Sequence, residues 1–187
     1  MHFESRFTVT GSPRAVIEQF ADVPLMAGFL PGASVEAPKE DGSYPATLLA
    51  SFGPKKLAFR GTLTNRVDRE ALGGTLAGQA SADVRGARMA VTMAYRLAPA
   101  EGATDTTEVL LESDAQLTGV LAEFARTGGV IVAEALIAEF ARRFSAHMQA
   151  LSAGGEPVAA QGGATLSLLT VIAALLRRFR QRVWRTA

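Results

Sequence analysis

The feature that most constrains the fold is a long amphipathic stretch, residues 117–151, which predicts one long C-terminal helix. Its apolar residues recur at steps of three and four, the spacing that puts side chains on one helical face. They are Ala133, Ile137, Phe140, Phe144, Met148 and Leu151. The opposite side is charged, with Glu139 and Arg143 at the i,i+4 spacing of a solvated face. Such a helix needs a sheet to pack against.

Two glycines interrupt the first half of this stretch. Gly128 and Gly129 are adjacent, and paired glycines are a recognised cause of helix kinks. We therefore expect a bend there, with two helical pieces as the alternative to one continuous helix.

The N-terminal part predicts one strand and two short helices. Residues 2–9 alternate apolar and polar side chains, as in a half-buried strand. Ser12 before Pro13 is a typical helix start. Asp22 before Pro24 begins a second short helix, which the Pro31-Gly32 pair ends.

Residues 33–117 predict successive strands joined by tight turns. The clearest strand is 57–67, where apolar and polar side chains alternate, and residues 89–97 and 109–117 show the same period of two. Short connections exclude parallel crossovers, so the sheet is expected to be antiparallel. The predicted class is α+β: a curved antiparallel sheet of about six to seven strands wrapped on the long helix.

Several positions on the dry face of this sheet are small: Ala46, Ala50, Gly61, Gly78, Ala80 and Ala82. They either let aromatic side chains of the helix approach closely or leave an internal lipophilic cavity. Both interpretations stand at this point. The candidate ligand-binding residues are Phe29, Leu30, Leu48, Phe52, Phe59, Leu63, Met89, Met93, Tyr95, Phe124, Phe140 and Phe144.

Charge and composition together divide the chain into three parts. All 18 acidic residues lie before position 163, whereas residues 163–187 hold five arginines and no acid. A Gly-, Ala- and Pro-rich run predicts a flexible linker at 152–163. We therefore expect a domain at 1–151, that linker, and a separate amphipathic tail helix at 164–187.

The tail is predicted to lie at a membrane surface. Its uncharged run of thirteen residues is too short to span a bilayer, but apolar residues at helical spacing, arginines and a tryptophan suit an interfacial helix. The candidate membrane-binding residues are Leu168, Leu169, Ile172, Leu175, Leu176, Arg177, Arg178, Phe179, Arg180, Arg182, Trp184 and Arg185. Docking on a partner protein is the alternative, and nucleic acid is not an expected partner.

The sequence contains no strong catalytic signature. P-loop, GxSxG, HExxH and Rossmann motifs are absent, and with no cysteine and two histidines no metal site is expected. His147 is expected to be packed in the helix interface, and Asp22 to cap a helix. Tyr95 and Asn65 fall on the dry face, where they either orient a ligand or bond within the core.

The sequence resembles the CoxG family of carbon monoxide dehydrogenase accessory proteins over residues 1 to about 150. The resemblance rests on Asp22-Val23-Pro24-Leu25, Phe29-Leu30-Pro31-Gly32-Ala33, Tyr44, Gly53-Pro54, Phe59-Arg60-Gly61 and Thr118-Gly119-Val120-Leu121-Ala122. It departs from the family at 122–129, where a glycine is expected soon after the Leu-Ala pair. The resemblance implies a START/Bet v 1-like helix-grip domain.

The resemblance also implies a function. Members are accessory proteins of molybdenum-containing carbon monoxide dehydrogenases and related hydroxylases, and are thought to bring the enzyme to the cytoplasmic membrane. The expected protein is a non-catalytic, peripheral protein of the inner membrane face with no covalently bound cofactor. It would carry a lipophilic quinone, menaquinone or ubiquinone, with membrane lipid and the hydroxylase as partners. The alternatives are a docking adaptor without ligand and a cyclase-like enzyme of the same fold.

Overall fold

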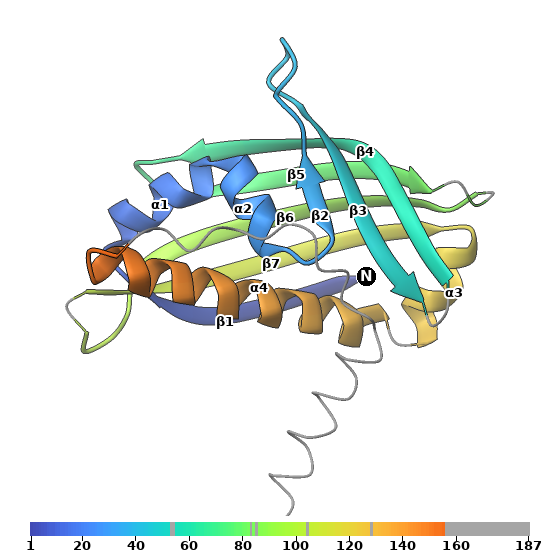
Figure 1. The fold of residues 1–187 in the computed structure, drawn as a ribbon. Coiled ribbons are helices and arrows are strands. Elements are labelled where there is room, and N and C mark those ends of the chain that lie inside the picture. The colour runs from blue at the N-terminus through green and yellow to red at the C-terminus, as the bar shows by residue number, and fades with distance from the viewer. Residues whose placement is uncertain (53–54, 83, 85, 104, 128, 156–187) are drawn as a thin grey trace, which may run out of the picture.

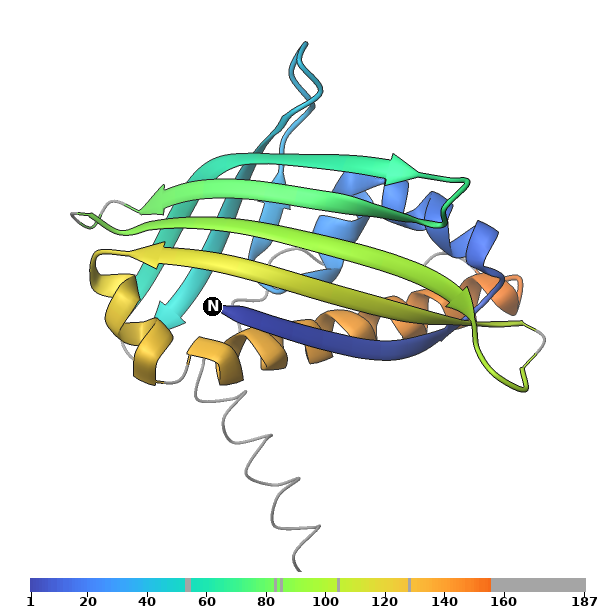
Figure 2. The same ribbon diagram turned by 180° about the vertical axis from the view of Figure 1, so that it is seen from behind.

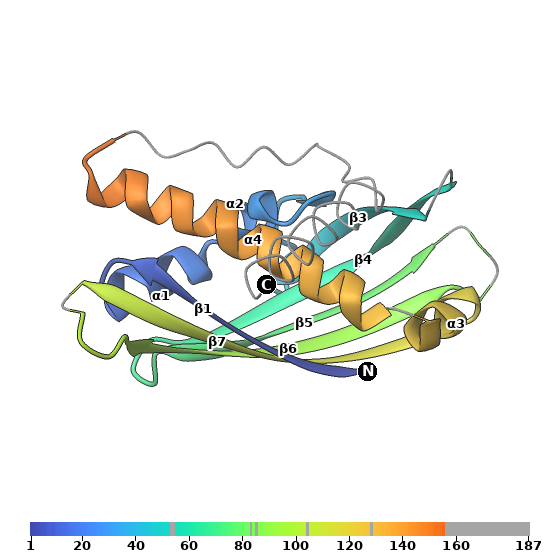
Figure 3. The same cartoon turned by 90° about the horizontal axis from the view of Figure 1, so that it is seen from below.

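The computed structural model describes residues 1–155 except 53–54, 83, 85, 104 and 128. One sheet and one layer of helices make up this part of the chain (Figures 1 and 3). The elements in chain order are β1 (His2–Thr10), α1 (Pro13–Ala21), α2 (Val23–Phe29), β2 (Ala33–Val35), β3 (Tyr44–Phe52), β4 (Lys55–Asp68), β5 (Gly73–Ala82), β6 (Arg88–Pro99), β7 (Thr106–Thr118), α3 (Val120–Thr127) and α4 (Gly129–Ser152).

The sheet has seven strands in the order β1-β7-β6-β5-β4-β3-β2, and every neighbouring pair is antiparallel. From β2 to β7 each strand pairs with the next along the chain, as the short connections predicted. β1 instead pairs with β7, so the first and last strands lie side by side. The predicted α+β class and the antiparallel sheet of six to seven strands are confirmed.

The two short helices begin where the sequence predicted. Ser12 caps α1 through its hydroxyl, which accepts a hydrogen bond from the backbone nitrogen of Ala15 at 3.3 Å. The Asp22 carboxylate caps α2 by accepting one from Leu25 N at 3.0 Å. α1 lies near the C-terminal end of α4, and α2 lies beside the middle of α4 (Figure 3).

The predicted start of the long helix at Leu117 is wrong. Leu117 and Thr118 belong to β7, and helix begins only at Val120. Gly119 lies between them at φ +64°, and a Cβ there would overlap the backbone of Gly86, so only glycine fits this corner. Residues 117 and 118 are part of the strand because the apolar–polar alternation of residues 109–117 continues almost to this glycine.

The expected interruption of the helix is present. α3 ends at Thr127 and α4 begins at Gly129, so the amphipathic stretch forms two helices. α3 covers one end of the sheet, while α4 runs along β1 over the concave face (Figure 1). In the view from behind, α1 and α2 lie on the far side of the sheet, α4 passes behind β1, and α3 lies at the end of the sheet (Figure 2).

Two groups of apolar side chains fill the space beneath the helices. The major cluster lies under α1, α2 and α4, and its buried members are Val9, Val16, Ile17, Phe20, Phe29, Tyr95, Leu97, Val109, Leu111, Ile137, Phe140, Phe144 and Met148. The minor cluster lies near α3, with Phe59, Ala87 and Leu121 buried. Around the minor cluster the remaining apolar side chains are only partly buried.

Candidate ligand-binding site

The structure holds a cavity of about 170 Å³ between the sheet and the helices. It is bounded by α1, α2 and α4 on one side and by β4 to β7 on the other. The residues that line it are Phe20, Val23, Met26, Ala27, Leu30, Leu63, Asn65, Leu76, Met93, Tyr95, Leu111, Ile137 and Phe140. The lining is apolar except for the side chains of Asn65 and Tyr95.

The helical wall of the cavity follows from the sequence of α2. Val23, Met26 and Ala27 stand at i, i+3 and i+4, so they share one face of the helix, and Leu30 follows directly after the helix as its C-cap residue. The Asp22 cap fixes where that helix starts, and therefore which face meets the sheet.

The sheet wall follows from strand register. Asn65 on β4, Leu76 on β5 and Met93 on β6 are paired in one row across the concave face. All three point to the same face because residues directly opposite each other in an antiparallel pair have side chains on one face of the sheet. Tyr95 and Leu111 belong to the next row.

The two polar side chains of the lining bond to each other. Tyr95 Oη donates to Asn65 Oδ1 at 3.0 Å, and Asn65 Nδ2 donates to the backbone oxygen of Phe20 at 2.8 Å. Burial raises the pKa of Tyr95, so its hydroxyl stays protonated at neutral pH. The pair therefore adds no charge to the cavity.

Aromatic rings support one side of the cavity. Phe20 lies against Tyr95 with ring centroids 4.9 Å apart and meets Phe144 edge-on at 5.5 Å. Phe140 stacks beside Phe144 at 5.9 Å, and Phe29 lies 5.7 Å from Phe144. Such contacts favour one ring arrangement, so this wall is expected to be rigid.

The predicted ligand-binding residues fall into three groups. Five line the cavity: Leu30, Leu63, Met93, Tyr95 and Phe140. Phe29 and Phe144 lie in the major cluster behind the cavity wall, with 2% and 0% of their surface exposed. Leu48, Phe59 and Met89 belong to the minor cluster, away from the cavity. The side chains of Phe52 and Phe124 lie outside the described part of the structure.

Sequence reasoning missed seven residues of the lining: Phe20, Val23, Met26, Ala27, Leu76, Leu111 and Ile137. An eighth, Asn65, was expected either to orient a ligand or to bond within the core, and was not among the ligand-binding candidates. The i, i+3, i+4 stripe of α2 is the signal that could have found three of them. The sequence pattern puts Ile137 on the buried helix face and Asn65 on the dry sheet face, but neither pattern tells which buried residues border a cavity.

His147 is packed in the core, as expected. It is 1% exposed, and its Nε2 lies 3.1 Å from Oε1 of Gln19 on α1, which joins α4 to α1. Its ring lies 5.1 Å from that of Phe29. Among the described lining residues of the cavity there is no histidine, carboxylate or lysine.

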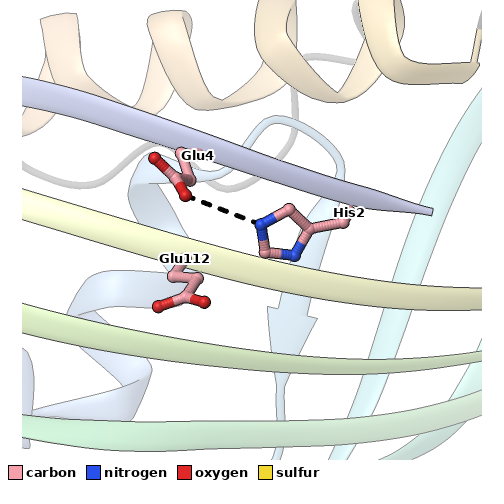
Figure 4. A group of neighbouring side chains, drawn as sticks. All are labelled: His2, Glu4 and Glu112. Atoms are coloured by element: carbon pink, nitrogen blue, oxygen red, sulfur yellow. Dashed lines mark ion pairs between the residues drawn. The ribbon is translucent and has the colours of Figure 1, made fainter.

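A cluster of ionisable side chains lies on the outer face of β1 and β7. His2, Glu4 and Glu112 bring their ligand atoms within 4.8 Å of one another, and all three are exposed (Figure 4). His2 Nε2 lies 3.6 Å from Glu4 Oε1, and a hydrogen bond with Asp114 raises the pKa of His2. Surface ion pairing accounts for this arrangement.

A second hollow, of about 570 Å³, lies on the outer face of β4 to β7. Arg60, Gln79, Arg88 and Gln116 contribute to it, and all four are exposed. The sequence pattern assigns Arg60 and Arg66 to a solvated surface, and both lie on that face. This hollow is a broad polar depression and offers no enclosed apolar space.

The predicted linker and tail lie almost wholly outside the described residues, which end at Gly155. The membrane-binding candidates at 168–185 therefore stay a prediction. Within the described part of the chain, no helix has both the length and the apolar character needed to cross a bilayer.

Comparison with known proteins identifies the fold. No family model and no curated protein matches the sequence. Among solved structures, a conserved protein from Geobacillus kaustophilus aligns at 17% identity and a TM-score of 0.67, over 80% of this chain and 95% of its own. A START superfamily protein from Mycobacterium smegmatis aligns at 12% identity and 0.54, over 80% and 98%.

A third similar structure is an enzyme. The Zhui aromatase/cyclase from Streptomyces sp. R1128 aligns at 18% identity and a TM-score of 0.50, over 83% of this chain and 98% of its own. At these identities the likeness concerns the fold alone. Seven antiparallel strands curved around one long helix give this chain a helix-grip fold like that of the START superfamily protein.

Proposed function

We propose that this protein is a carrier that holds a lipophilic, ring-bearing ligand between its sheet and α4. The observation that carries the proposal is the cavity, which is apolar and whose two polar side chains are already bonded to each other. Cavities of this kind exclude charge and accept apolar rings. A pure adaptor would have no need to keep this space open in its core.

The volume limits what the cavity holds. An apolar cavity of about 150 Å³ accommodates a benzene-sized molecule, so 170 Å³ fits the ring system of a ligand and no long chain. A chain attached to that ring would have to lie elsewhere on apolar surface. Each methylene of the chain buried there would add about 0.8 kcal/mol to the binding free energy.

Partly buried apolar residues of the minor cluster offer such surface. Leu48, Ala80 and Met89 point to the concave face without being fully covered. On β4, Leu63 borders the cavity while Phe59, four residues earlier on the same face, belongs to the minor cluster. A chain leaving the cavity in this direction would reach the partly buried apolar residues of the minor cluster.

The finer proposal comes from the resemblance and the tail. A quinone, menaquinone or ubiquinone, combines a ring of suitable size with an isoprenoid chain. In this proposal the protein is a membrane-associated accessory of a molybdenum-containing carbon monoxide dehydrogenase or related hydroxylase. The basic segment 164–187 would rest on anionic lipid, where each arginine contributes about 1 kcal/mol.

Organic extraction of protein purified from its native membranes, followed by mass spectrometry, tests the ligand. We expect a quinone in the wild type and none in Ala27→Phe, which puts a ring into the cavity from α2. Ala90→Phe, on the exposed outer face of β6, is the matched control and should keep the ligand. Wild-type protein without any lipophilic ligand would contradict the carrier proposal.

Vesicle flotation tests the membrane part separately. Deletion of residues 163–187 should abolish co-flotation with vesicles that contain phosphatidylglycerol and leave quinone extraction unchanged. Unchanged co-flotation of the truncated protein would exclude the tail as the anchor. Co-purification with a molybdenum hydroxylase from the native host tests the partner.

An enzyme of the cyclase kind is the second candidate, and the likeness to an aromatase/cyclase is the observation that favours it. Tyr95 is the one described lining residue able to give or take a proton, and its hydroxyl already donates to Asn65. Cyclisation of a polyketide substrate that is lost in Tyr95→Phe would favour this candidate over the carrier.

A further inference from the structure

A buried hydroxyl near the cavity has no hydrogen-bond partner among the described residues. Ser113, on β7, is 0% exposed, and its Oγ makes no hydrogen bond there. Buried polar side chains are normally bonded, and one left unpaired costs free energy in the folded state. A serine in this position therefore requires a reason.

Other buried polar groups on the inner face of the sheet are bonded. The Thr107 hydroxyl donates to the backbone oxygen of Gly11 at 2.7 Å. Asn65 and Tyr95 bond to each other. Ser113 differs from these residues, although it stands in the same strand as Thr107 and faces the same way.

The position of Ser113 places it beside the cavity. It faces inward, two residues after Leu111 on the same face of β7, and it pairs directly with Met93 of β6. Both Leu111 and Met93 line the cavity. Ser113 thus continues the row of Asn65, Leu76 and Met93 by one strand.

Met93 lines the cavity and is the direct cross-strand partner of Ser113. Its side chain is unbranched and flexible, and methionine adapts readily to the shape of a ligand. A change of its rotamer would extend the cavity toward Ser113 without moving the backbone. The neighbour on the other side of Ser113, Phe3 of β1, packs against the major cluster.

We propose that the Ser113 hydroxyl donates a hydrogen bond to a carbonyl oxygen on the ring of the bound ligand, reached by displacement of the Met93 side chain. Ser113 is then the specificity-determining residue, which selects an oxygenated ring over a pure hydrocarbon. This inference rests on the proposed carrier function. It adds the chemical class of the ligand, a cyclic ketone or quinone.

Paired probes test the inference in the full-length protein. Menadione and 2-methylnaphthalene share a methylated two-ring skeleton, and only menadione has carbonyl groups. Equilibrium dialysis gives Kd for each probe with the wild type and with Ser113→Ala. We expect the substitution to weaken menadione binding by about two- to tenfold, the range of one neutral hydrogen bond. Binding of 2-methylnaphthalene should change less than about twofold, because it has no carbonyl to lose a hydrogen bond.

The thermal stability of the ligand-free protein gives an independent readout. Because Ser113 Oγ has no partner in the described structure, Ser113→Ala should leave Tm unchanged or raise it. Ser113→Thr keeps the hydroxyl and should keep the preference for menadione. The exposed Ser34→Ala on β2 is the control and should behave as wild type.

Four outcomes would overturn the inference. Equal weakening of both probes would make Ser113 a packing residue, and a lower Tm of the ligand-free Ser113→Ala would show that the hydroxyl serves the folded state. Wild-type binding of both probes without preference would also overturn it while the carrier proposal survives. If the wild type binds neither probe, the carrier proposal fails with it.

Discussion

The two apolar clusters of this domain differ in how completely they are covered. In the major cluster, thirteen residues are buried beneath α1, α2 and α4, five of them phenylalanine or tyrosine, and nine apolar neighbours are partly covered. In the minor cluster, three residues are buried and eight apolar neighbours are only partly covered. The same curved sheet therefore has one closed end and one open end.

The difference follows from where the helices lie. α4 contacts β1 more than any other strand and joins α2 at the closed end, whereas α3 has only eight residues to cover the other end. Apolar surface left partly open is costly unless something covers it. The closed end holds most of the buried apolar residues, and in the proposed carrier the partly covered end is where a ligand would exchange.

The largest expected effect is at the closed end. Phe144→Ala removes a fully buried ring at the centre of the aromatic contacts and should lower the free energy of unfolding by about 3–5 kcal/mol. Leu48 is a partly buried neighbour of the minor cluster, so Leu48→Ala should lower the free energy of unfolding by less than about 2 kcal/mol. Urea denaturation followed by circular dichroism measures both. Equal losses of unfolding free energy in Phe144→Ala and Leu48→Ala would contradict the difference in coverage between the two ends of the sheet.

The next effect concerns the polar pair of the cavity. A Cβ at Gly74 would overlap Tyr95 Oη and the backbone oxygen of Arg66, so Gly74→Ala must displace the tyrosine hydroxyl from Asn65. We expect a loss of about 1–3 kcal/mol in the free energy of unfolding. At Gly78 the nearest atom is the tip of Leu63, at 3.2 Å, so Gly78→Ala is the milder control. Identical urea midpoints for Gly74→Ala and Gly78→Ala would contradict the predicted difference in stability.

Two methionines of β6, Met93 and Met89, allow the cavity and the minor cluster to be compared within one strand. Met93 borders the cavity and Met89 belongs to the minor cluster. Both are partly buried, so truncation to alanine should cost about 1–2 kcal/mol in each case. Only Met93→Ala enlarges the cavity, and it alone should change the Kd for menadione. An equal change in Met89→Ala would place the ligand at the open end instead.

The smallest effect is electrostatic and lies on the outer side of α4. Hydrogen bonds from Arg142 and Arg143 hold the pKa of Glu139 down to about 2, against an ordinary value of 4.5. A carboxylate with a depressed pKa stabilises the fold above pH 4.5, and this contribution disappears as pH falls toward 2. At neutral pH, Glu139→Gln should cost less than about 1 kcal/mol because the pair is near the surface.

The measurement is the difference in Tm between wild type and Glu139→Gln from about pH 7 to about pH 2. We expect the difference to be constant above about pH 5 and to shrink below that value. A difference that grows as the pH falls would have the wrong sign for this ion pair.

Local patterns in the sequence predicted most of the elements. Alternation of period two gave the strands, and the Ser12-Pro13 and Asp22-Pro24 pairs gave the starts of α1 and α2. The stripe from Ile137 to Met148 gave the buried face of α4. These features depend on neighbours three or four residues away at most, which is why one sequence suffices to find them.

The tertiary structure decided which of the inward-facing residues meet empty space. Leu30 and Phe140 border the cavity while Phe29 and Phe144 fill the core, although each pair has the same apolar character. The sequence determined that a sheet would pack on an amphipathic helix. Only the curvature of the sheet and the placement of α2 decided where a cavity is left, because those depend on contacts between residues far apart in the chain.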